Sequence, residues 1–378
     1  MESPFIYNKF VTGPDFIPRS AELNLLTDML NQRQNCLIAE PAKSGKKSLV
    51  NQAIYLMEKE SANFRLCKID LFNVKTQHRL LTKYVNKLLK LFAIRHEELQ
   101  SIAKDYLDKI PYTVSNPESG NPTGNIVISK NLSPAQKSEI LGLANRLSEG
   151  MSTNVIVYIE EFQEISTHAN AEETFALINK TWAQHTKCTY LITGSYVNLM
   201  NEIFENFRVM DKKIERIRLE RISEKCLTDF VIRNFQKAGK VIPKEVAEQM
   251  CRMTDNHPWY TQHLADISYG LTRGYVNNQV LSQAFALLLE YHSHNFKLIT
   301  HRMSHFQLNL LKAILDGHSK FSSSEMLEKY ELQSSANVNR LKEAVQKKEI
   351  ILFEKGGATF MDPLFRVWLK DIFYNQSV

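Results

Sequence analysis

Residues 35–48 decide the fold, and they read Asn-Cys-Leu-Ile-Ala-Glu-Pro-Ala-Lys-Ser-Gly-Lys-Lys-Ser. The apolar run Asn35–Ala39 predicts a short buried strand, and the periodicity of Ser48–Lys59 predicts a helix. A turn with one glycine and three lysines joins them. Further strand candidates alternate with helical segments before residue 220, at Arg65–Leu71, Val155–Ile159 and Tyr190–Thr193. This alternation predicts an α/β domain with a parallel sheet that helices cover on both faces.

The composition fits a folded protein of two or three domains. Of the 378 residues 43% are hydrophobic and 10% aromatic, which excludes a disordered chain. The net charge of +6 permits a nucleic-acid partner without requiring one. No apolar run approaches the roughly 20 residues of a membrane span, and we expect no secretory signal. The five cysteines include no CxxC pair, which favours a cytoplasmic location over a disulfide framework.

The α/β region is expected to occupy residues 1–221. One long helical pattern covers residues 76–110, and a turn-rich insertion follows at about 111–134. The insertion contains two β-rich pieces that predict a hairpin, Tyr112–Val114 and Ile126–Ser129. Ile214–Glu220 alternates apolar and charged residues and is the last strand candidate.

Two further domains are predicted after residue 221. Residues 222–298 show only helical patterns, which predicts an all-helical lid. Residues 299–378 contain three helical segments and a hairpin whose turn is Lys355-Gly356-Gly357. The three helical segments are Phe306–Asp316, Ser323–Tyr330 and Ala336–Lys348. Three helices followed by a hairpin predict a winged helix-turn-helix domain.

The turn after the first strand matches part of the phosphate-binding P-loop pattern, G-x-x-x-x-G-K-[ST]. Gly45 lets backbone N–H groups curl around an anion, and Lys46 can reach the β- and γ-phosphates from the start of a helix. Glu40 replaces the first glycine, and Lys47 replaces the hydroxyl that binds Mg²⁺. Ser48 is one residue late, a rotation of about 100° on a helix. A solvated basic turn is the alternative, and the position between strand and helix favours phosphate binding.

The strand candidate Val155–Ile159 ends in two acids, Glu160 and Glu161, as a Walker B segment does. In such a segment the first acid holds Mg²⁺ and the second polarises the attacking water. Glu160 replaces the usual aspartate, so its carboxylate projects one methylene further. A buried strand that leads into an acidic helix start is the alternative interpretation.

A third motif, Thr193-Gly194-Ser195, ends another strand candidate. A polar side chain there can sense the γ-phosphate, whereas an ordinary Gly-Ser turn is the simpler alternative. Ligands of open α/β sheets bind at the carboxyl ends of the strands. Three motifs in order, each at the end of a strand, are therefore more specific for nucleotide than any one alone.

With these motifs the chain resembles the archaeal-type ATPase family, AAA+-like P-loop proteins of the STAND-related branch. Phe16–Leu23 resembles the family's F-x-G-R-x-x-E-L box, with Pro18 in place of the glycine. Glu160–Gln163 resembles its D-E-F-Q, and Asn256–Gln262 resembles the G-x-P-x-x-x-Q of its lid. Asp362–Leu369 matches the distinctive ending D-P-L-F-x-x-W-L. The resemblance covers nearly the whole chain.

The resemblance implies a five-stranded parallel core, ATP as the ligand and a cytoplasmic location. It implies that Glu160 holds a metal, that Glu161 orients water and that Ser195 senses the γ-phosphate. Arg208 is the best candidate for an arginine finger in the basic stretch Arg208–Arg221, and a solvated strand face is the favoured interpretation of the other basic residues there. The implied nucleotide-binding residues are Ala42, Lys43, Ser44, Gly45, Lys46, Lys47, Ser48, Ile17 and Arg19. Mg²⁺ is the usual companion of ATP, and Lys47 argues against it here.

Two functional hypotheses remain open. The departures at Glu40, Lys47 and Glu160 predict an ATP-binding conformational switch with weak or absent hydrolysis, so the chain is an ATPase only if this site is active. The alternative is a non-catalytic scaffold that acts through its winged helix as a DNA-binding or protein-interaction module. The third helix of that domain carries basic residues that suit DNA phosphates or a solvated face, namely Arg340, Lys342, Lys347 and Lys348.

Overall fold

The computed structural model describes residues 2–354 and 357–375. It divides into two compact units, and each is described by itself. The first, here called the lid unit, comprises residues 1–19, 41–48 and 220–378. The second, the sheet unit, comprises residues 20–40 and 49–219. The separation of a lid at 222–298 from a winged helix at 299–378 stays a prediction.

The sheet unit is built on five strands in the order β2-β5-β6-β1-β7. They are β1 (Asn35–Ala39), β2 (Phe64–Asp70), β5 (Asn154–Glu160), β6 (Thr189–Gly194) and β7 (Ile214–Arg216). All neighbouring strands pair in parallel, so the expected five-stranded parallel core is confirmed. The last strand is shorter than the alternating pattern to Glu220 predicted.

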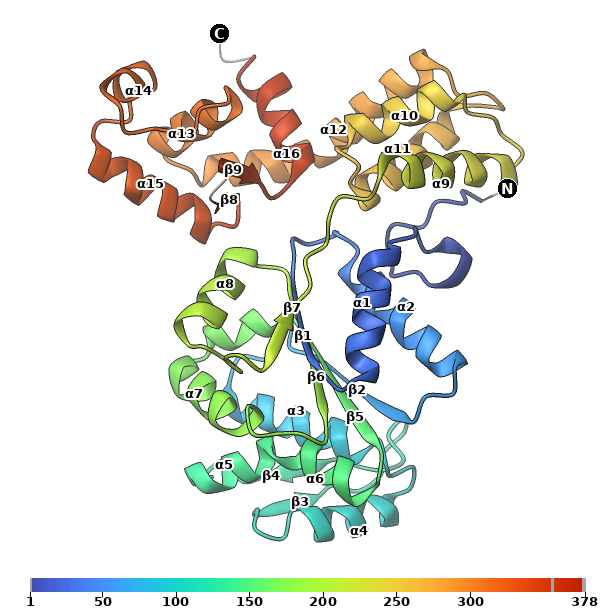
Figure 1. Cartoon of the computed structure of the whole chain (residues 1–378), viewed down its shortest axis with the longest axis vertical. Helices are drawn as coiled ribbons and strands as arrows, with labels where there is room; N and C mark the ends of the chain where they lie inside the picture. The colour runs from blue at the N-terminus through green and yellow to red at the C-terminus, as the bar shows by residue number, and fades with distance from the viewer. Residues whose placement is uncertain (1, 355–356, 376–378) are drawn as a thin grey trace. The chain divides into compact units, whose positions relative to one another are not determined.

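Helices cover both faces of this sheet, as Figure 1 shows. One face carries α1 (Ser20–Asn31) and α2 (Lys46–Lys59). The other carries α3 (Gln77–Leu89), α6 (Leu143–Gly150), α7 (Ala171–Trp182) and α8 (Val197–Asn206). Strand side chains alternate between the faces, so Leu37, Val157 and Ile192 all pack into the apolar core beneath the second set.

The single helix predicted over residues 76–110 is wrong, because two helices occupy that stretch. The helix α3 ends at Leu89, and α4 (His96–Tyr106) begins after a break. The carboxylate of Glu98 accepts the backbone N–H groups of Ile94 and Arg95, which fixes a new helix start there. The predicted hairpin is confirmed as β3 (Tyr112–Val114) and β4 (Ile126–Ile128). The sequence did not indicate α5 (Pro134–Leu141), α6 or α8.

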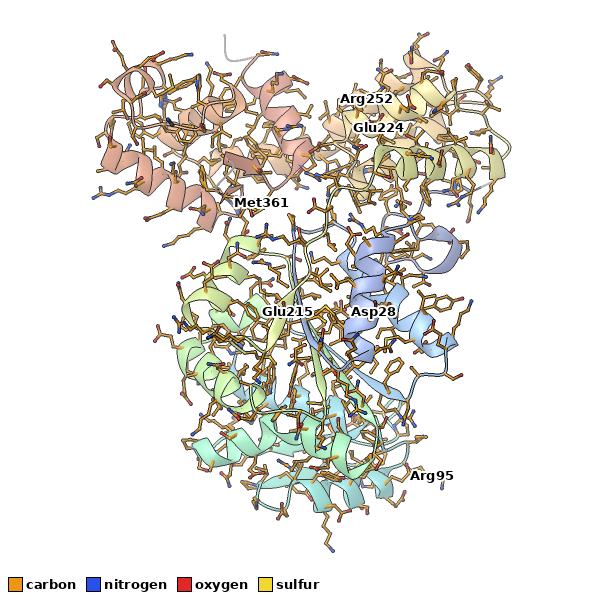
Figure 2. The ribbon with its side chains drawn as sticks, in the orientation of Figure 1. Asp28, Arg95, Glu215, Glu224, Arg252 and Met361 are labelled. Atoms are coloured by element: carbon orange, nitrogen blue, oxygen red, sulfur yellow. The ribbon has the colours of Figure 1, made fainter. Side chains whose placement is uncertain are left out.

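Four helices form the first half of the lid unit. They are α9 (Glu224–Lys237), α10 (Lys244–Met253), α11 (Pro258–Leu271) and α12 (Asn278–His301). The hydroxyl of Ser223 accepts the N–H of Cys226 and so caps α9. Arg252 pairs with Glu224 at 2.6 Å and joins α10 to α9 (Figure 2). None of the described helices is long and apolar enough to cross a membrane.

The C-terminal part of the lid unit has the predicted winged-helix pattern. Its elements are α13 (His305–Leu315), α14 (Ser324–Lys329), α15 (Ser335–Lys347), β8 (Ile351–Glu354), β9 (Gly357–Phe360), α16 (Pro363–Trp368) and the π-helix η3 (Leu369–Phe373). The strands β8 and β9 pair antiparallel. Residues 355 and 356 of the predicted turn lie outside the described residues. Leu310, Val338 and Trp368 are buried in one apolar core with the helices α9–α12.

Candidate functional site

The P-loop lies in the lid unit, as a tight turn that leads into α2. Gly45 has a φ of 98° and Lys43 a φ of 66°, so two residues of the turn are left-handed. The side chain of Lys46 is only 5% exposed, and its ammonium donates to the carbonyl of Pro41 at 2.8 Å. The turn is therefore wrapped around a buried lysine, which is the local form expected of a phosphate-binding loop.

A hydroxyl inside this loop has no protein partner. The Oγ of Ser44 is buried, and it makes no hydrogen bond with any described residue. Buried polar groups are normally paired, and an orphan hydroxyl costs about 1–3 kcal/mol. An oxyanion that enters the loop would satisfy this donor, so the structure fits a phosphate group here.

The two residues implied at the base lie beside the P-loop in the same unit. The guanidinium of Arg19 donates to the carbonyl of Ser44 at 3.2 Å and to the carbonyl of Glu220. Ile17 is 5% exposed and belongs to the apolar core of the lid unit. Arg19 thus braces the P-loop backbone, and its contact with a nucleotide base stays a prediction.

The remaining residues of the predicted binding set differ in their surroundings. Ala42 and Lys47 are exposed. The hydroxyl of Ser48 accepts the backbone N–H of Val11 at 3.2 Å. Whether Ser48 replaces the missing hydroxyl at Lys47 is not tested by this contact, and its role stays a prediction.

Positive charge and aromatic rings gather beside the P-loop in the lid unit. The ammonium of Lys43 lies 3.7 Å from the ring centroid of Trp259. Burial, with only partial compensation by Asp362, lowers the pKa of Lys43. Burial and then the charges of Arg221, Lys43 and Arg19 lower the pKa of His257 to about 3. An anion placed here would therefore meet several cations.

The lid helix α11 is tied to the end of the chain. The hydroxyl of Tyr260 donates to Oδ2 of Asp362 at 2.7 Å. The other oxygen, Oδ1, accepts the N–H groups of Leu364 and Phe365 and caps α16. Asp362 opens the D-P-L-F motif, so that motif joins the lid to the last helix of the winged-helix region.

His257 makes the stability of the lid unit depend on pH. Its pKa falls from 6.5 to about 3 on folding, so the unfolded chain binds more protons and stability declines as the pH falls below 6.5. His257→Asn keeps an acceptor at the start of α11 and removes the titration. Between pH 7 and 5 we expect the variant to lose about 2 kcal/mol less unfolding free energy than wild type. Urea unfolding at several pH values measures this, and equal losses would contradict it.

The second half of the predicted site lies in the sheet unit, at the carboxyl ends of β5 and β6. Glu161 follows β5 with a φ of 55°, and the 3₁₀ helix η2 (Phe162–Thr167) begins next. Oε1 of Glu161 accepts a hydrogen bond from the hydroxyl of Ser195 at 2.8 Å, and Oε2 of Glu161 accepts one from the amide of Gln163 at 2.6 Å. The structure thus brings Glu161 and Ser195 together, but both carboxylate oxygens of Glu161 are already engaged.

Gly194 of the T-G-S motif is required by close packing. A Cβ at this position would lie 2.6 Å from Oε1 of Gln163 and 2.5 Å from the sulfur of Met200, so a larger residue would displace them. The glycine therefore leaves the space in which Gln163 lies and donates to Glu161. This gives the T-G-S and E-F-Q motifs a shared structural basis.

Glu160, the predicted metal ligand, is bound to a lysine. It is 1% exposed at the end of β5, and its Oε1 lies 2.9 Å from Nζ of Lys68 on β2. No group of three metal-ligating side chains was found among the described residues. In the P-loop itself, Lys47 stands where Mg²⁺ normally finds a hydroxyl, so the loop does not offer that ligand.

The structure also describes the surroundings of Glu40 and Arg208. Oε1 of Glu40 accepts the backbone N–H of Leu219 at 3.0 Å in the sheet unit. This contact gives the carboxylate a structural role in place of the first glycine. Arg208 is exposed in a turn after α8 with a φ of 47°, and its service as an arginine finger stays a prediction.

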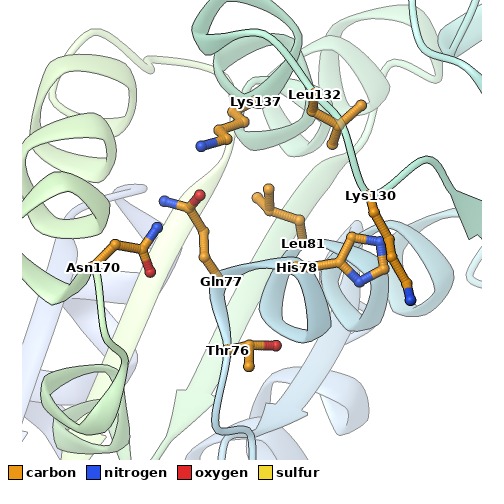
Figure 3. A pocket seen from close by; sticks show the side chains of 8 residues that line it. All are labelled: Thr76, Gln77, His78, Leu81, Lys130, Leu132, Lys137 and Asn170. Carbon is orange, nitrogen blue, oxygen red and sulfur yellow. The ribbon is translucent and has the colours of Figure 1, made fainter.

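A separate cavity of about 290 Å³ lies in the sheet unit at the start of α3. Figure 3 shows the amide of Gln77 between Lys137 and Asn170. Lys137 pairs with Glu173 at 2.8 Å, and Gln77 donates to Thr174. The Gln77 amide and the Lys137 ammonium therefore have partners in the protein, and we assign the cavity no ligand.

Sequence reasoning missed two contacts of the predicted site residues. One is the ion pair of Lys68 with Glu160, and the other is the contact of the Lys43 ammonium with the ring of Trp259. Leu66, Lys68 and Asp70 are two residues apart and therefore share one face of β2, and Lys68 is the only basic residue among them. The sequence could therefore have indicated a single positive charge on that face. The pairing with Glu160 was not available from sequence, since it depends on which strands are neighbours.

Comparisons with known proteins agree with this architecture. Residues 294–371 match a family model described as a probable winged helix domain. No curated protein matches the chain. The chain is similar to the Walker-type ATPase of Pyrococcus abyssi, with 16% identity and a TM-score of 0.66 over 97% of this chain and 99% of the other. It is similar to the ORC2 protein of Aeropyrum pernix in ADPNP–ADP complexes, with 12% identity and a TM-score of 0.57 over 99% and 98% of the chains. The chain thus has the fold of AAA+-like P-loop ATPases, as its motifs indicated.

Proposed function

We propose that the protein is a nucleotide-dependent switch that binds ATP at its P-loop and hydrolyses it slowly or not at all. The observation that carries the proposal is the buried, unpartnered hydroxyl of Ser44 inside a loop closed by Lys46 and Arg19. A phosphate oxygen in the loop would pair this donor and lie next to the buried ammonium of Lys46. We propose that the protein binds ATP in the cytoplasm, the location expected from the sequence.

The chain's own residues would hold the phosphates. Lys46 would exchange its bond with the Pro41 carbonyl for a phosphate oxygen, and the Ser44 hydroxyl would donate to the same group. The first backbone N–H groups of α2 add the positive end of a helix. Lys47, at the position of the missing hydroxyl, would supply a further positive charge.

The same unit offers a route from the P-loop to the winged helix. Bound phosphates would compete with the ring of Trp259 for the ammonium of Lys43, which lies 3.7 Å from that ring. Trp259 and Tyr260 are adjacent on α11, and Tyr260 holds Asp362 at the start of α16. Loss of the Lys43 contact would therefore change the position of α16, the helix that Asp362 caps in the winged-helix region.

Tryptophan fluorescence tests this switch. We expect ATP to change the emission of Trp259 as the ammonium of Lys43 moves, and Lys43→Met to remove most of that change. Lys59→Met is the matched control, because Lys59 makes a comparable contact with the ring of Tyr55 away from the P-loop. An ATP response that is the same in wild type and Lys43→Met would contradict the proposed route. Trp259→Phe identifies the emission that belongs to this residue.

DNA binding is the second candidate function, and the surface of α15 favours it. Arg340 and Lys347 are exposed and make no ion pair with any described residue. The ammonium of Lys342 instead lies 5.1 Å from the ring centroid of Phe321, and Lys348 donates to the carbonyl of Arg302. If the winged helix binds DNA, the first two residues would contact phosphates.

Reversing these two charges provides the test. We expect Arg340→Glu/Lys347→Glu to weaken duplex DNA binding and to reduce the log–log salt slope by about 2, at about 0.9 per phosphate contact. The control reverses two exposed lysines of α9, Lys225→Glu/Lys237→Glu, with the same change in net charge. Fluorescence anisotropy at several salt concentrations measures both. Equal losses in the two double variants would leave only non-specific charge attraction.

A further inference from the structure

We propose that Lys68 is a built-in counter-cation for the Walker B carboxylate, so that this protein binds nucleotide phosphates without a divalent metal. The inference rests on the proposed function, because it concerns how the same nucleotide would be held. It adds a residue that the motifs did not indicate, and it changes the ligand from metal-bound ATP to free ATP.

The sheet register places the two charges together. Lys68 on β2 is paired with Tyr158 on β5, and Asp70 is paired with Glu160. Residues two apart on a strand share a face, so Lys68 points to the same side as Glu160. Its long flexible stem carries the ammonium to 2.9 Å from Oε1. The contact follows from the backbone and does not require a mobile loop.

Burial of the acid favours this ion pair, in which the charges are close but Oε1 of Glu160 does not meet the geometry of a hydrogen bond. Glu160 is 1% exposed, and a buried carboxylate without a compensating charge is strongly unfavourable. Lys68 is 38% exposed, so its ammonium remains partly hydrated and pairs at a low desolvation cost. In related motifs a metal neutralises the acid at this position, whereas here the protein supplies the charge itself.

The pair also disfavours a metal. An ammonium in contact with the carboxylate repels a dication that approaches the same group. Mg²⁺ tolerates little deviation from octahedral geometry, so it does not readily share a ligand with a lysine. Lys47 stands at the sequence position of the second metal-binding group. Each of the two motifs that usually supply a metal ligand thus carries a lysine, by sequence position in the P-loop and by contact at Glu160, and we expect free ATP to be the preferred ligand.

The test separates the two lysines. ATP affinity is measured by titration calorimetry with EDTA and with Mg²⁺ for Lys47→Thr and for Lys47→Thr/Lys68→Gln, where the glutamine keeps a hydrogen-bond donor. We expect Lys47→Thr to bind ATP equally in both buffers, because Lys68 still occupies Glu160. The double variant should bind at least about 10-fold more tightly with Mg²⁺, a difference of about 1.4 kcal/mol. Mn²⁺ electron paramagnetic resonance of the ATP complexes gives a second readout, with bound Mn²⁺ expected only for the double variant.

Two controls accompany it in the Lys47→Thr background. Lys68→Arg keeps the positive charge and should remain indifferent to metal. Arg65→Met removes an exposed cation of the same strand for which no ion pair is found among the described residues, and it should also change nothing. If Lys47→Thr/Lys68→Gln does not fold, Lys47→Thr/Lys68→Met is measured instead.

Two results would overturn the inference. One is metal-dependent binding by Lys47→Thr alone, which would mean that Lys68 does not block the site. The other is a folded double variant that gains no metal dependence. Absence of ATP binding by wild type in both buffers would instead overturn the proposed function itself, and the inference with it.

Discussion

Lys46→Ala is expected to abolish the rise in melting temperature that ATP produces. At ATP concentrations about 100-fold above Kd, binding stabilises the folded state by about 2.7 kcal/mol, or roughly 5–10 °C for a domain of this size. Lys46 is the buried cation at the centre of the P-loop, and its removal takes away the one ammonium that donates to the carbonyl of Pro41 inside the turn and would reach the phosphates from there. Differential scanning fluorimetry with and without ATP measures the shift.

Lys59→Ala is the matched control for this experiment. Lys59 lies at the other end of the same helix, α2, and its ammonium is 4.8 Å from the ring centroid of Tyr55. Its loss should lower the melting temperature slightly while leaving the ATP shift intact. A Lys46→Ala protein that keeps the full ATP shift would place the nucleotide elsewhere.

Phosphate release by the wild-type protein is expected to be close to that of a Glu161→Gln variant. Ordinary enzymes turn over at about 1 s⁻¹ or faster. Here Glu161 accepts hydrogen bonds from Ser195 and Gln163 on both oxygens, and Glu160 is paired with Lys68. These contacts hold both carboxylates within the protein and occupy part of their acceptor capacity. We therefore expect them to serve poorly in orienting water or holding a metal, and the two proteins should release phosphate at similar, very low rates.

A coupled phosphate-release assay over hours makes this comparison. Wild-type turnover near 1 s⁻¹ that disappears in Glu161→Gln would show a working catalytic acid and contradict slow hydrolysis. Gln163→Ala provides a further check, because it frees one oxygen of Glu161. If the hydrogen bond from Gln163 restrains Glu161, this variant should release phosphate at least as fast as wild type.

The sequence predicted the α/β core well because its signals are local. A short apolar strand, a glycine turn and a helix start are adjacent in residues 35–48, and the structure has β1 and α2 there. The hairpin and the capped helices of the lid are likewise encoded within a few residues, as Ser223 at the start of α9 shows. Where two helices share one uninterrupted periodicity, as in residues 76–110, sequence reasoning joined them.

Contacts between distant segments explain most of what sequence reasoning missed. The pairing of Lys68 with Glu160 depends on β2 lying beside β5, which are separated by more than 80 residues in the chain. Glu40 stands at the sequence position of the first P-loop glycine, and its hydrogen bond with the Leu219 backbone could not be read from the sequence. The motif D-P-L-F was visible, but its link through Tyr260 to the lid was not.

The most direct test of the central claim is the affinity of the wild-type protein for ATP in EDTA. The account predicts one binding site per chain, because the only P-loop motif in the sequence begins after β1. It predicts a dissociation constant within about twofold of the value measured with Mg²⁺, a difference of less than about 0.5 kcal/mol. Titration calorimetry in the two buffers gives both values. Binding that requires Mg²⁺, or no binding in either buffer, would contradict the account.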